Sequence, residues 1–351
     1  MTKKQHYMRY DERCKLEAHL KNGRTVPWIA AELGFCTQTI RNEIERGAYM
    51  HNVEYAYEKR YSADKGQIIH ELNQTSKGRP LKIGNDIEYA NFLESKMLGV
   101  QEDGSIDRRK RYSPAAALAE ASKRDFQTKV CVTTLYSYIT KEIFLHLTNK
   151  DLIVKSEKKH KKRPVRRIAH PALPSITDRP QEINDRTEHG HKEIDLVVGK
   201  SKTKAAVLTM VDRVTRSAWS FKIPDKSAAS VRAVFDRLER KLGKKRFREE
   251  FKSVTPDNGS EFMEFEQLQA SIFGGKRFEI YYCHSYAAWE KGGNENYNRM
   301  FRRFFPKGTD FSKVSQKEIA EAQAWINHYP RKILGWKSAA EVEAEGGPRR
   351  G

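Results

Sequence analysis

The chain has 351 residues, enough for more than one domain and for at least one substantial hydrophobic core. Its 66 lysine and arginine residues outnumber its 46 acidic residues and give a formal net charge of +20, which favours nucleic acid over an anionic membrane surface as the polyanionic partner. The sequence has no run of about 18 apolar residues, no secretory signal, and no cysteine spacing typical of a zinc finger or disulfide framework, so we expect a cytoplasmic protein.

Residues 1–65 are expected to form a DNA-binding domain, with a helix-turn-helix unit over residues 10–48. Apolar residues at helical spacing predict three short helices in this unit. In the third, TQTIRNEIERG, Ile40 and Ile44 face the interior. The opposite face carries side chains suited to reading bases in a major groove, namely Gln38, Thr39, Arg41 and Asn42. The alternative is a three-helix bundle without a reading function.

Residues 66–150 are expected to form a second helical region that also binds DNA. It opens with a polar connection over residues 66–85. Ser113 and Pro114 suit the start of a helix in PAAALAEASKR, and a helix in VTTLYSYITKEIF would complete a second helix-turn-helix. For the last segment a strand is the alternative, because Val, Thr and Tyr favour strands.

Residues 151–182 are expected to be a basic linker that contains proline. The stretch from Lys155 to Pro180 is dense in Lys and Arg and then in Pro, and it lacks the periodicity of a packed element. It either lies along DNA phosphates or is a solvated tether.

Residues 183–345 alternate between strand and helix patterns. HKEIDLVVGK, AAVLTMVDRV and SAWSFKIP predict three consecutive strands, and SAASVRAVFDRLERKLG predicts an amphipathic helix after them. FKSVTPD and FEIYYCH predict two further strands, and each of them is followed by a helical pattern. This order predicts an α/β layer of the ribonuclease H type, in which acidic side chains gather at strand ends. The expected fold class is therefore multidomain: an all-α helix-turn-helix N-terminal region followed by an α/β ribonuclease H-like core.

Three acidic residues of this core stand where a strand or helix end can present a carboxylate to a shared metal ion. Asp195 lies inside an apolar run, so its burial requires a cation or hydrogen bonds, and a lysine salt bridge is the alternative to a metal. Asp257 begins the turn of DNGSEF. For the third acid, Glu295 at a helix start is favoured over Glu290 beside a glycine loop, because a helix holds a ligand more rigidly. Glu193 is a candidate accessory ligand.

Carboxylates that converge on Mg²⁺ suit the chemistry of a phosphodiester. The metal can bind both the oxygen that attacks the phosphorus and the oxygen that leaves it, and this arrangement suits an enzyme that acts on DNA. The positive net charge of the chain agrees with a DNA substrate.

Together these segments resemble bacterial insertion-sequence transposases with a DDE catalytic core, specifically the insertion sequence thirty family. The similarity runs from about Tyr10 to Val342 and is carried by TIRNEIERG, EHGHKEIDLVVGK, TPDNGSEF, WEKGGNENYNRMFRRFFPKGTDF and NHYPRKILGWKSAAEV. The chain departs from the family pattern at AAWEKGGNEN, where SPWERGTNEN is usual. The resemblance implies an integrase-type core that binds two Mg²⁺ ions, or Mn²⁺ in their place, with catalytic and metal-binding acids at Asp195, Asp257 and Glu295.

The resemblance also implies a function. A member of this family binds the terminal inverted repeats of its own element, then cleaves and transfers strands by phosphodiester transesterification in the bacterial nucleoid. It acts as a homodimer or higher homo-oligomer on double-stranded DNA. Further DNA contacts are expected from Asn298, Arg302, Arg303 and Lys307. The alternatives are a non-catalytic DNA-binding regulator derived from a transposase, and a ribonuclease H-type nuclease that acts on RNA in hybrids.

Overall fold

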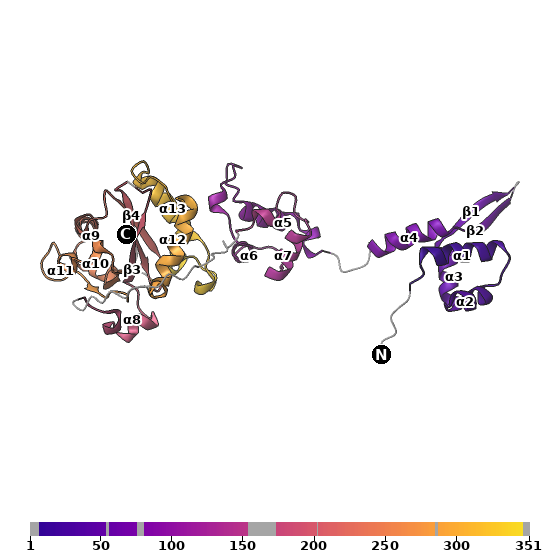
Figure 1. Ribbon diagram of the computed structural model, residues 1–351, viewed down its shortest axis with the longest axis horizontal. Coiled ribbons are helices and arrows are strands. Elements are labelled where there is room, and N and C mark those ends of the chain that lie inside the picture. Colours follow the sequence, from indigo (N-terminus) through magenta and orange to yellow (C-terminus); the bar gives the residue numbers. More distant parts are fainter. Residues whose placement is uncertain are drawn as a thin grey trace. The chain divides into compact units, whose positions relative to one another are not determined.

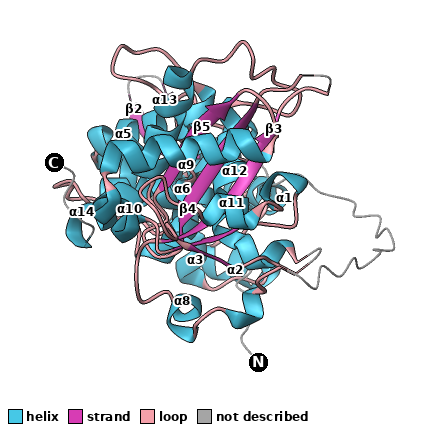
Figure 2. Cartoon of the chain, turned by 90° about the vertical axis from the view of Figure 1, so that its left-hand side faces the viewer, coloured by secondary structure: helices cyan, strands magenta, loops and turns pink. Residues whose placement is uncertain are grey.

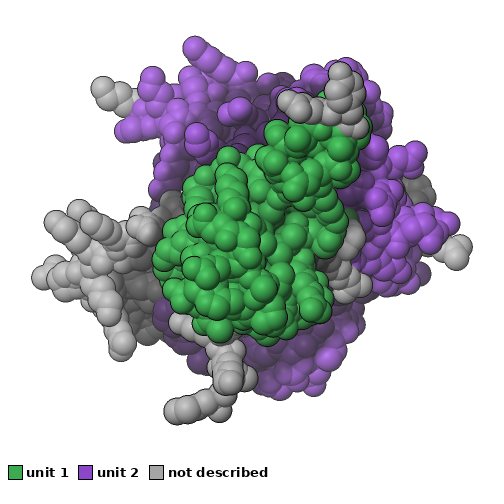
Figure 3. Space-filling model, turned by 90° about the vertical axis from the view of Figure 1, so that its right-hand side faces the viewer, with its two compact units in different colours: residues 1–81 green, residues 82–351 purple. Residues whose placement is uncertain are grey.

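The computed structural model describes residues 7–53, 56–75, 81–153, 173–201, 203–284 and 287–346. The chain separates into two compact units, unit 1 with residues 1–81 and unit 2 with residues 82–351, which Figure 3 distinguishes by colour. Most of the expected basic linker lies outside the described residues, and so does the KGRP stretch before residue 81. In the described part of the chain, no helix combines the length and apolar character needed to cross a membrane.

Unit 1 contains the three helices that the sequence predicts, and they pack around a small core. Leu16, Ile29 and Ile40 are fully buried, one from each helix. Gly34 ends the second helix in the left-handed conformation, with φ of 72°, where glycine avoids the steric penalty of a side chain. The helices are α1 (Tyr10–Lys21), α2 (Val26–Leu33) and α3 (Thr37–Arg46).

The expectation of an all-α N-terminal region is wrong after residue 47. The chain there forms an antiparallel hairpin of β1 (Ala48–Val53) and β2 (Ala56–Tyr61), followed by α4 (Ala63–Thr75). The hairpin is mostly exposed, so its sequence lacks the alternation of apolar and polar residues that marks a half-buried strand. Helix α4 also replaces the first half of the polar connection expected over residues 66–85.

A buried ion pair joins the helices of unit 1. The Nε atom of Arg13 on α1 donates to Oε1 of Glu43 on α3 over 2.8 Å, and the two side chains are only 1% and 2% exposed. The same guanidinium donates to the carbonyl oxygen of Met8 and, over 2.7 Å, to Gln67 Oε1 on α4. One arginine therefore connects three helices.

Unit 2 begins with a helical region over residues 82–153. Helices α5 (Ile87–Leu98), α6 (Pro114–Ala121) and α7 (Val132–Thr140) pack around their own hydrophobic core. VTTLYSYIT is thus helical, so the strand alternative for this segment is wrong. Short 3₁₀ turns complete the region at Lys82–Asn85, Arg108–Lys110 and Asn149–Asp151.

The remainder of unit 2 is a five-stranded sheet between two layers of helices (Figure 1). The strand order is β5-β4-β3-β6-β7, with β3, β4 and β5 antiparallel and with β6 and β7 parallel to β3. Figure 2 shows the three long strands side by side. The strands are β3 (His191–Val198), β4 (Ala206–Asp212), β5 (Ala218–Ile223), β6 (Ser253–Thr255) and β7 (Glu279–Ile280).

Alternate residues of the strands face the two helix layers. Ile194 and Met210 belong to the core under α9, α10 and α11, whereas Val197 and Val211 belong to the core under α12 and α13. The expected order of strands and helices is present. The helices are α8 (Gln181–Asp185), α9 (Ala228–Leu242), α10 (Lys244–Glu250), α11 (Phe265–Gln269), α12 (Gly292–Phe304), α13 (Gln316–His328) and α14 (Ala339–Gly346), with 3₁₀ turns at Ile176–Asp178, Ser260–Phe262, Ala288–Lys291 and Lys332–Leu334.

Replacing Arg13 by methionine should destabilise unit 1, because it removes the buried cation of Glu43 and leaves that carboxylate with Arg46, a partly exposed side chain, as its remaining ion-pair partner. Breaking a buried pair in this way costs about 3–5 kcal/mol. We expect the amide hydrogens of α1 and α3 to exchange roughly a hundredfold faster or more, as measured by hydrogen exchange and mass spectrometry.

Lys59→Met is the matched control for this change. Lys59 pairs with Glu45, and both side chains are more than half exposed, so the pair contributes about 0–1 kcal/mol. Equal exchange in Arg13→Met and in the unaltered chain would show that the buried pair does not hold these helices together.

Candidate active site

The parallel pairing of β3 with β6 aligns two acidic residues. Glu193 on β3 is the register partner of Thr255 on β6. Asp195 and Asp257 each follow two residues later along parallel chains, so they come to the same level at the same end of the sheet. This juxtaposition is the one expected for acids at strand ends.

A lysine ammonium group lies between the two aspartates. The Nζ atom of Lys291 is 3.2 Å from Oδ1 of Asp195 and 3.2 Å from Oδ2 of Asp257. It also donates to the carbonyl oxygen of Ile194 over 3.2 Å. Lys291 ends the 3₁₀ turn at Ala288–Lys291, and its side chain is 10% exposed. Both carboxylates therefore converge on one positive charge.

Burial makes the charge of Asp195 costly. It raises the pKa of Asp195 above its ordinary value, Lys291 opposes this effect, and the neighbouring Asp257 charge adds to it. Burial lowers the pKa of Lys291, but the charges of Asp195 and Asp257 outweigh burial and leave that pKa raised. The ammonium is therefore charged at neutral pH, and it supplies the salt bridge that the sequence offered as the alternative to a metal.

Helix α12 is tied to Asp195 through Asn298. The Nδ2 atom of Asn298 donates to Oδ2 of Asp195 over 2.6 Å. The hydroxyl of Thr209 on β4 donates to the Asp195 carbonyl oxygen and contacts Oδ1 of Asn298, at 3.2 and 3.3 Å. Asn298 thus orients the Asp195 carboxylate in this structure, and its contact with DNA stays a prediction.

Glu295 lies one turn before Asn298 on α12, so the two side chains leave the same side of the helix. It is exposed, and within the described residues no hydrogen bond or ion pair is recorded for it. The same part of the chain has no group of three or more His, Cys, Asp or Glu arranged to hold a metal. The structure therefore brings together Asp195 and Asp257 at Lys291, and it places Glu295 one helical turn from Asn298, which bonds to Asp195.

The alternative third acid, Glu290, is hydrogen-bonded to another residue, His284. Its two carboxylate oxygens accept from the backbone N–H of His284 over 2.8 Å and contact the His284 ring at Nδ1 over 2.7 Å. Glu290 therefore anchors the turn that carries Lys291 to the chain after β7. Its carboxylate is already occupied, in contrast to that of Glu295.

Glu193 holds the N-terminus of α12. It is fully buried, and its Oε1 accepts from Arg213 Nη1 while its Oε2 accepts from the backbone N–H of Asn294, both at 3.0 Å. A Cβ atom on Gly293 would lie 2.7 Å from Oε2 of Glu193 and 2.9 Å from Nη1 of Arg216, so any side chain at this position would force one of these groups or the helix start to move. Glu193 thus caps helix α12 in this structure, and its role as an accessory metal ligand stays a prediction.

The other expected DNA contacts differ in how they are placed. On α3, the side chains of Gln38, Arg41 and Asn42 are exposed, and Gln38 Nε2 donates to Asn42 Oδ1 over 2.9 Å. Cys36 caps the same helix, because its sulfur accepts a hydrogen bond from the backbone N–H of Thr39, whose side chain is half-buried.

Two arginines on α12 point into the protein. Arg302 donates to the carbonyl oxygen of Val198 over 2.7 Å, and Arg303 donates to that of Arg111 over 2.6 Å and lies over the Trp325 ring. Lys307 is exposed just beyond the helix.

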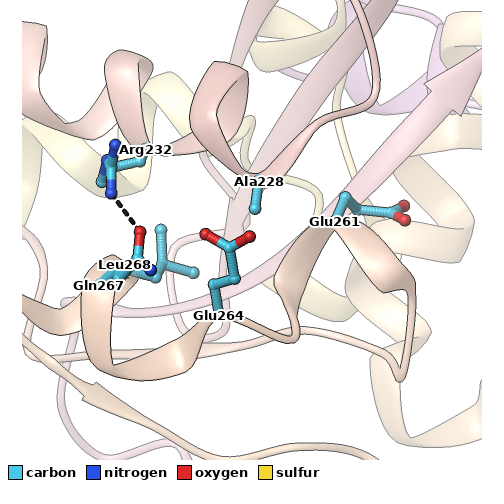
Figure 4. Close-up of a pocket in the computed structure, with 6 residues that line it drawn as sticks. All are labelled: Ala228, Arg232, Glu261, Glu264, Gln267 and Leu268. Atoms are coloured by element: carbon cyan, nitrogen blue, oxygen red, sulfur yellow. Dashed lines mark hydrogen bonds between the residues drawn. The ribbon is translucent and has the colours of Figure 1, made fainter.

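A shallow hollow is lined by residues of α9, of α11 and of the segment between Glu261 and Glu264 (Figure 4). Arg232 and Gln267 are hydrogen-bonded at one side of it, whereas the Glu261 carboxylate points away from the other lining side chains. Neither Asp195 nor Asp257 lines it. The acid site is therefore separate from this hollow.

Comparison with known proteins identifies the core. Residues 185–272 match the model of the integrase core domain, which spans Asp195 and Asp257. The chain is 30% identical over 338 residues to the probable transposase for the insertion-like sequence element IS1161 of Streptococcus salivarius, covering 94% of this chain and 92% of that protein.

Two further relatives match about half of the chain. The transposase for insertion sequence element IS1086 of Cupriavidus metallidurans is 36% identical, over 51% of this chain and 50% of that protein. Transposase InsI for insertion sequence element IS30C of Escherichia coli K12 is 32% identical, over 49% and 42%. The α/β core, the matched integrase model and the nearly full-length similarity together establish that this chain belongs to the IS30-type insertion-sequence transposases, which are DNA-transposition enzymes of the DDE type.

Proposed function

We propose that this transposase binds the terminal inverted repeats of its own insertion sequence, cleaves the DNA at the element ends and joins the released ends to target DNA. The convergence of the Asp195 and Asp257 carboxylates on one cation carries this proposal. Two carboxylates held at a distance of 3.2 Å from one positive group are hard oxygen donors of the kind that a divalent cation prefers. Asp195, Asp257 and Glu295 are the proposed catalytic residues.

The donor set fits Mg²⁺, with Mn²⁺ as a substitute. Asp195 and Asp257 would hold the metal together with Glu295. Two bound ions would supply neutralisation of charge on the attacking and leaving oxygens of the phosphodiester. Asn298 keeps the Asp195 carboxylate in place for this role, and Glu193 keeps the start of α12, and with it Glu295, against the sheet.

The reaction has two displacements at phosphorus. Water attacks the phosphodiester at the element end, and the bond to the 3′ oxygen breaks, which leaves a 3′ hydroxyl. That hydroxyl attacks a target phosphodiester, so one bond is formed for each bond broken and no covalent protein intermediate is needed. Both ends must be held during joining, and we therefore expect a homodimer or higher homo-oligomer on the DNA.

Helix α3 is the proposed reader of the inverted repeats. Its exposed face carries an arginine flanked by two amide side chains, Gln38 and Asn42, and these are the groups that pair with guanine and adenine edges in a major groove. The helical region of α5 to α7 is proposed as a second DNA-binding part, and Lys307 as a phosphate contact.

Asp257→Asn should abolish cleavage of DNA from the flanks of the element while leaving end binding nearly unchanged. The amide removes the negative charge that the site needs but keeps the size of the side chain. Cleavage is measured with end-labelled DNA in Mg²⁺, Mn²⁺ or chelator, and binding by gel shift.

Glu264→Gln is the control for this change, because Glu264 is an exposed acid near the same loop that does not contact the aspartates. Equal cleavage by Asp257→Asn would refute the assigned site. Specific binding by the unaltered chain without any cutting would instead favour a non-catalytic regulator.

Arg41→Ala should weaken binding to the inverted repeat by about 1–3 kcal/mol, because it removes a base contact. The measurement compares the dissociation constants for repeat and unrelated DNA at one salt concentration. Lys15→Ala, an exposed cation on α1, serves as the control. An equal loss on both DNAs would make Arg41 a phosphate contact and not a reader.

Gly293→Ala should reduce cleavage on the order of 10- to 100-fold, because the added methyl group displaces the start of α12 and moves Glu295. Gly292→Ala is the adjacent control, since a Cβ there meets nothing within 4 Å. Cleavage rates of the bound complexes, with circular dichroism of both variants, are the measurement. Equal rates in the two variants would show that the position of α12 does not control catalysis.

A further inference from the structure

The ammonium group of Lys291 has the contacts of a bound ion. Its three N–H donors match three acceptors: Oδ1 of Asp195, Oδ2 of Asp257 and the carbonyl oxygen of Ile194, each at 3.2 Å. The side chain is 10% exposed, so water replaces few of these contacts. Two carboxylates that would otherwise repel each other thus share one internal cation.

We propose that Lys291 is the resident counter-ion of the metal-free active site and that it competes directly with the divalent metal for the Asp195 and Asp257 oxygens. This inference rests on the proposed function, because it assumes that these two aspartates are metal ligands. In this role Lys291 neutralises the two carboxylates until the metal replaces it.

Mg²⁺ and the Lys291 ammonium group cannot both bind the same oxygen atoms of Asp195 and Asp257 at once. Mg²⁺ requires oxygens at about 2.0–2.1 Å in near-octahedral order. An ammonium nitrogen that remains hydrogen-bonded to the same two oxygen atoms occupies the space in which those oxygens converge. Loading of the site therefore requires Lys291 to withdraw from Asp195 and Asp257.

The backbone around Lys291 can keep its place during this withdrawal. The ammonium group sits on a flexible four-carbon stem, and the next residue, Gly292, has open space beside it. The fixed point follows at Gly293, which packs against Glu193. The backbone of α12 can therefore stay in place while the lysine side chain moves.

The experiment measures Mn²⁺ binding to the full chain without DNA, by isothermal titration calorimetry after treatment with chelator. Lys291→Met should bind Mn²⁺ about tenfold more tightly than the unaltered chain, because the competing cation is gone. Its melting temperature in chelator should be lower, since the two aspartates then lack a counter-ion, and the rise on adding Mn²⁺ should be larger. Lys291→Gln provides a second variant with a polar side chain.

Lys192→Met is the matched control. Lys192 is a buried lysine on β3, 5% exposed, that pairs with Asp212 at 3.5 Å and with Glu250 at 3.8 Å. Its removal should destabilise the protein equally with and without Mn²⁺ and should leave the Mn²⁺ affinity unchanged.

The outcomes separate the two proposals. If neither the unaltered chain nor Lys291→Met binds Mn²⁺, the proposed metal site is wrong. If the unaltered chain binds Mn²⁺, Asp257→Asn binds it weakly, and both Lys291 variants bind as the unaltered chain does or more weakly, the site stands and the competition by Lys291 is refuted.

Discussion

The parallel register between β3 and β6 is the constraint on which the active site depends. It brings two chain segments that are about sixty residues apart in sequence to one level, so that Asp195 and Asp257 face one cation. Backbone hydrogen bonds fix this register, and a shift of one residue would turn one carboxylate to the opposite face of the sheet. The geometry of the acids is therefore a property of the sheet and not of the loops alone.

The core beside this site also contains a buried carboxylate, that of Glu193. Glu193 is fully buried beside the site, yet both of its oxygens accept hydrogen bonds, from Arg213 and from the start of α12. Burial of a carboxylate is tolerated only with such partners. The same carboxylate favours a glycine at position 293, because a side chain there would displace either the carboxylate or the start of α12. In the sequence GGNEN, the second glycine, Gly293, therefore packs against Glu193, whereas Glu295 is exposed to solvent.

The sequence predicts much of this architecture for identifiable reasons. Strand β4 is a nearly continuous apolar run, and β3 and β5 carry enough Ile, Leu, Val and aromatic residues to be recognised as strands. The DNGSEF turn marks Asp257. The hairpin after residue 47 was missed because its strands are exposed and carry no alternating pattern.

Lys291 was missed for a different reason. It lies in a polar segment whose composition is typical of a loop, where a lysine is usually exposed on the surface. Only the folded structure shows that two aspartates converge on it. The inward direction of Arg302 and Arg303 was likewise not predictable, because their acceptors are carbonyl groups of distant residues.

Helix α12 connects the acid site with the helical region. Its first turn carries Glu295, and near its last turn Arg303 bonds to Arg111 of the helical region, while Tyr329 after α13 bonds to Ser113 of the same region. With 13 residues, α12 is a rod roughly 20 Å long. It therefore links the turn that carries Glu295 to the contacts with the helical region, and Glu295 keeps its place relative to that region as long as these hydrogen bonds hold.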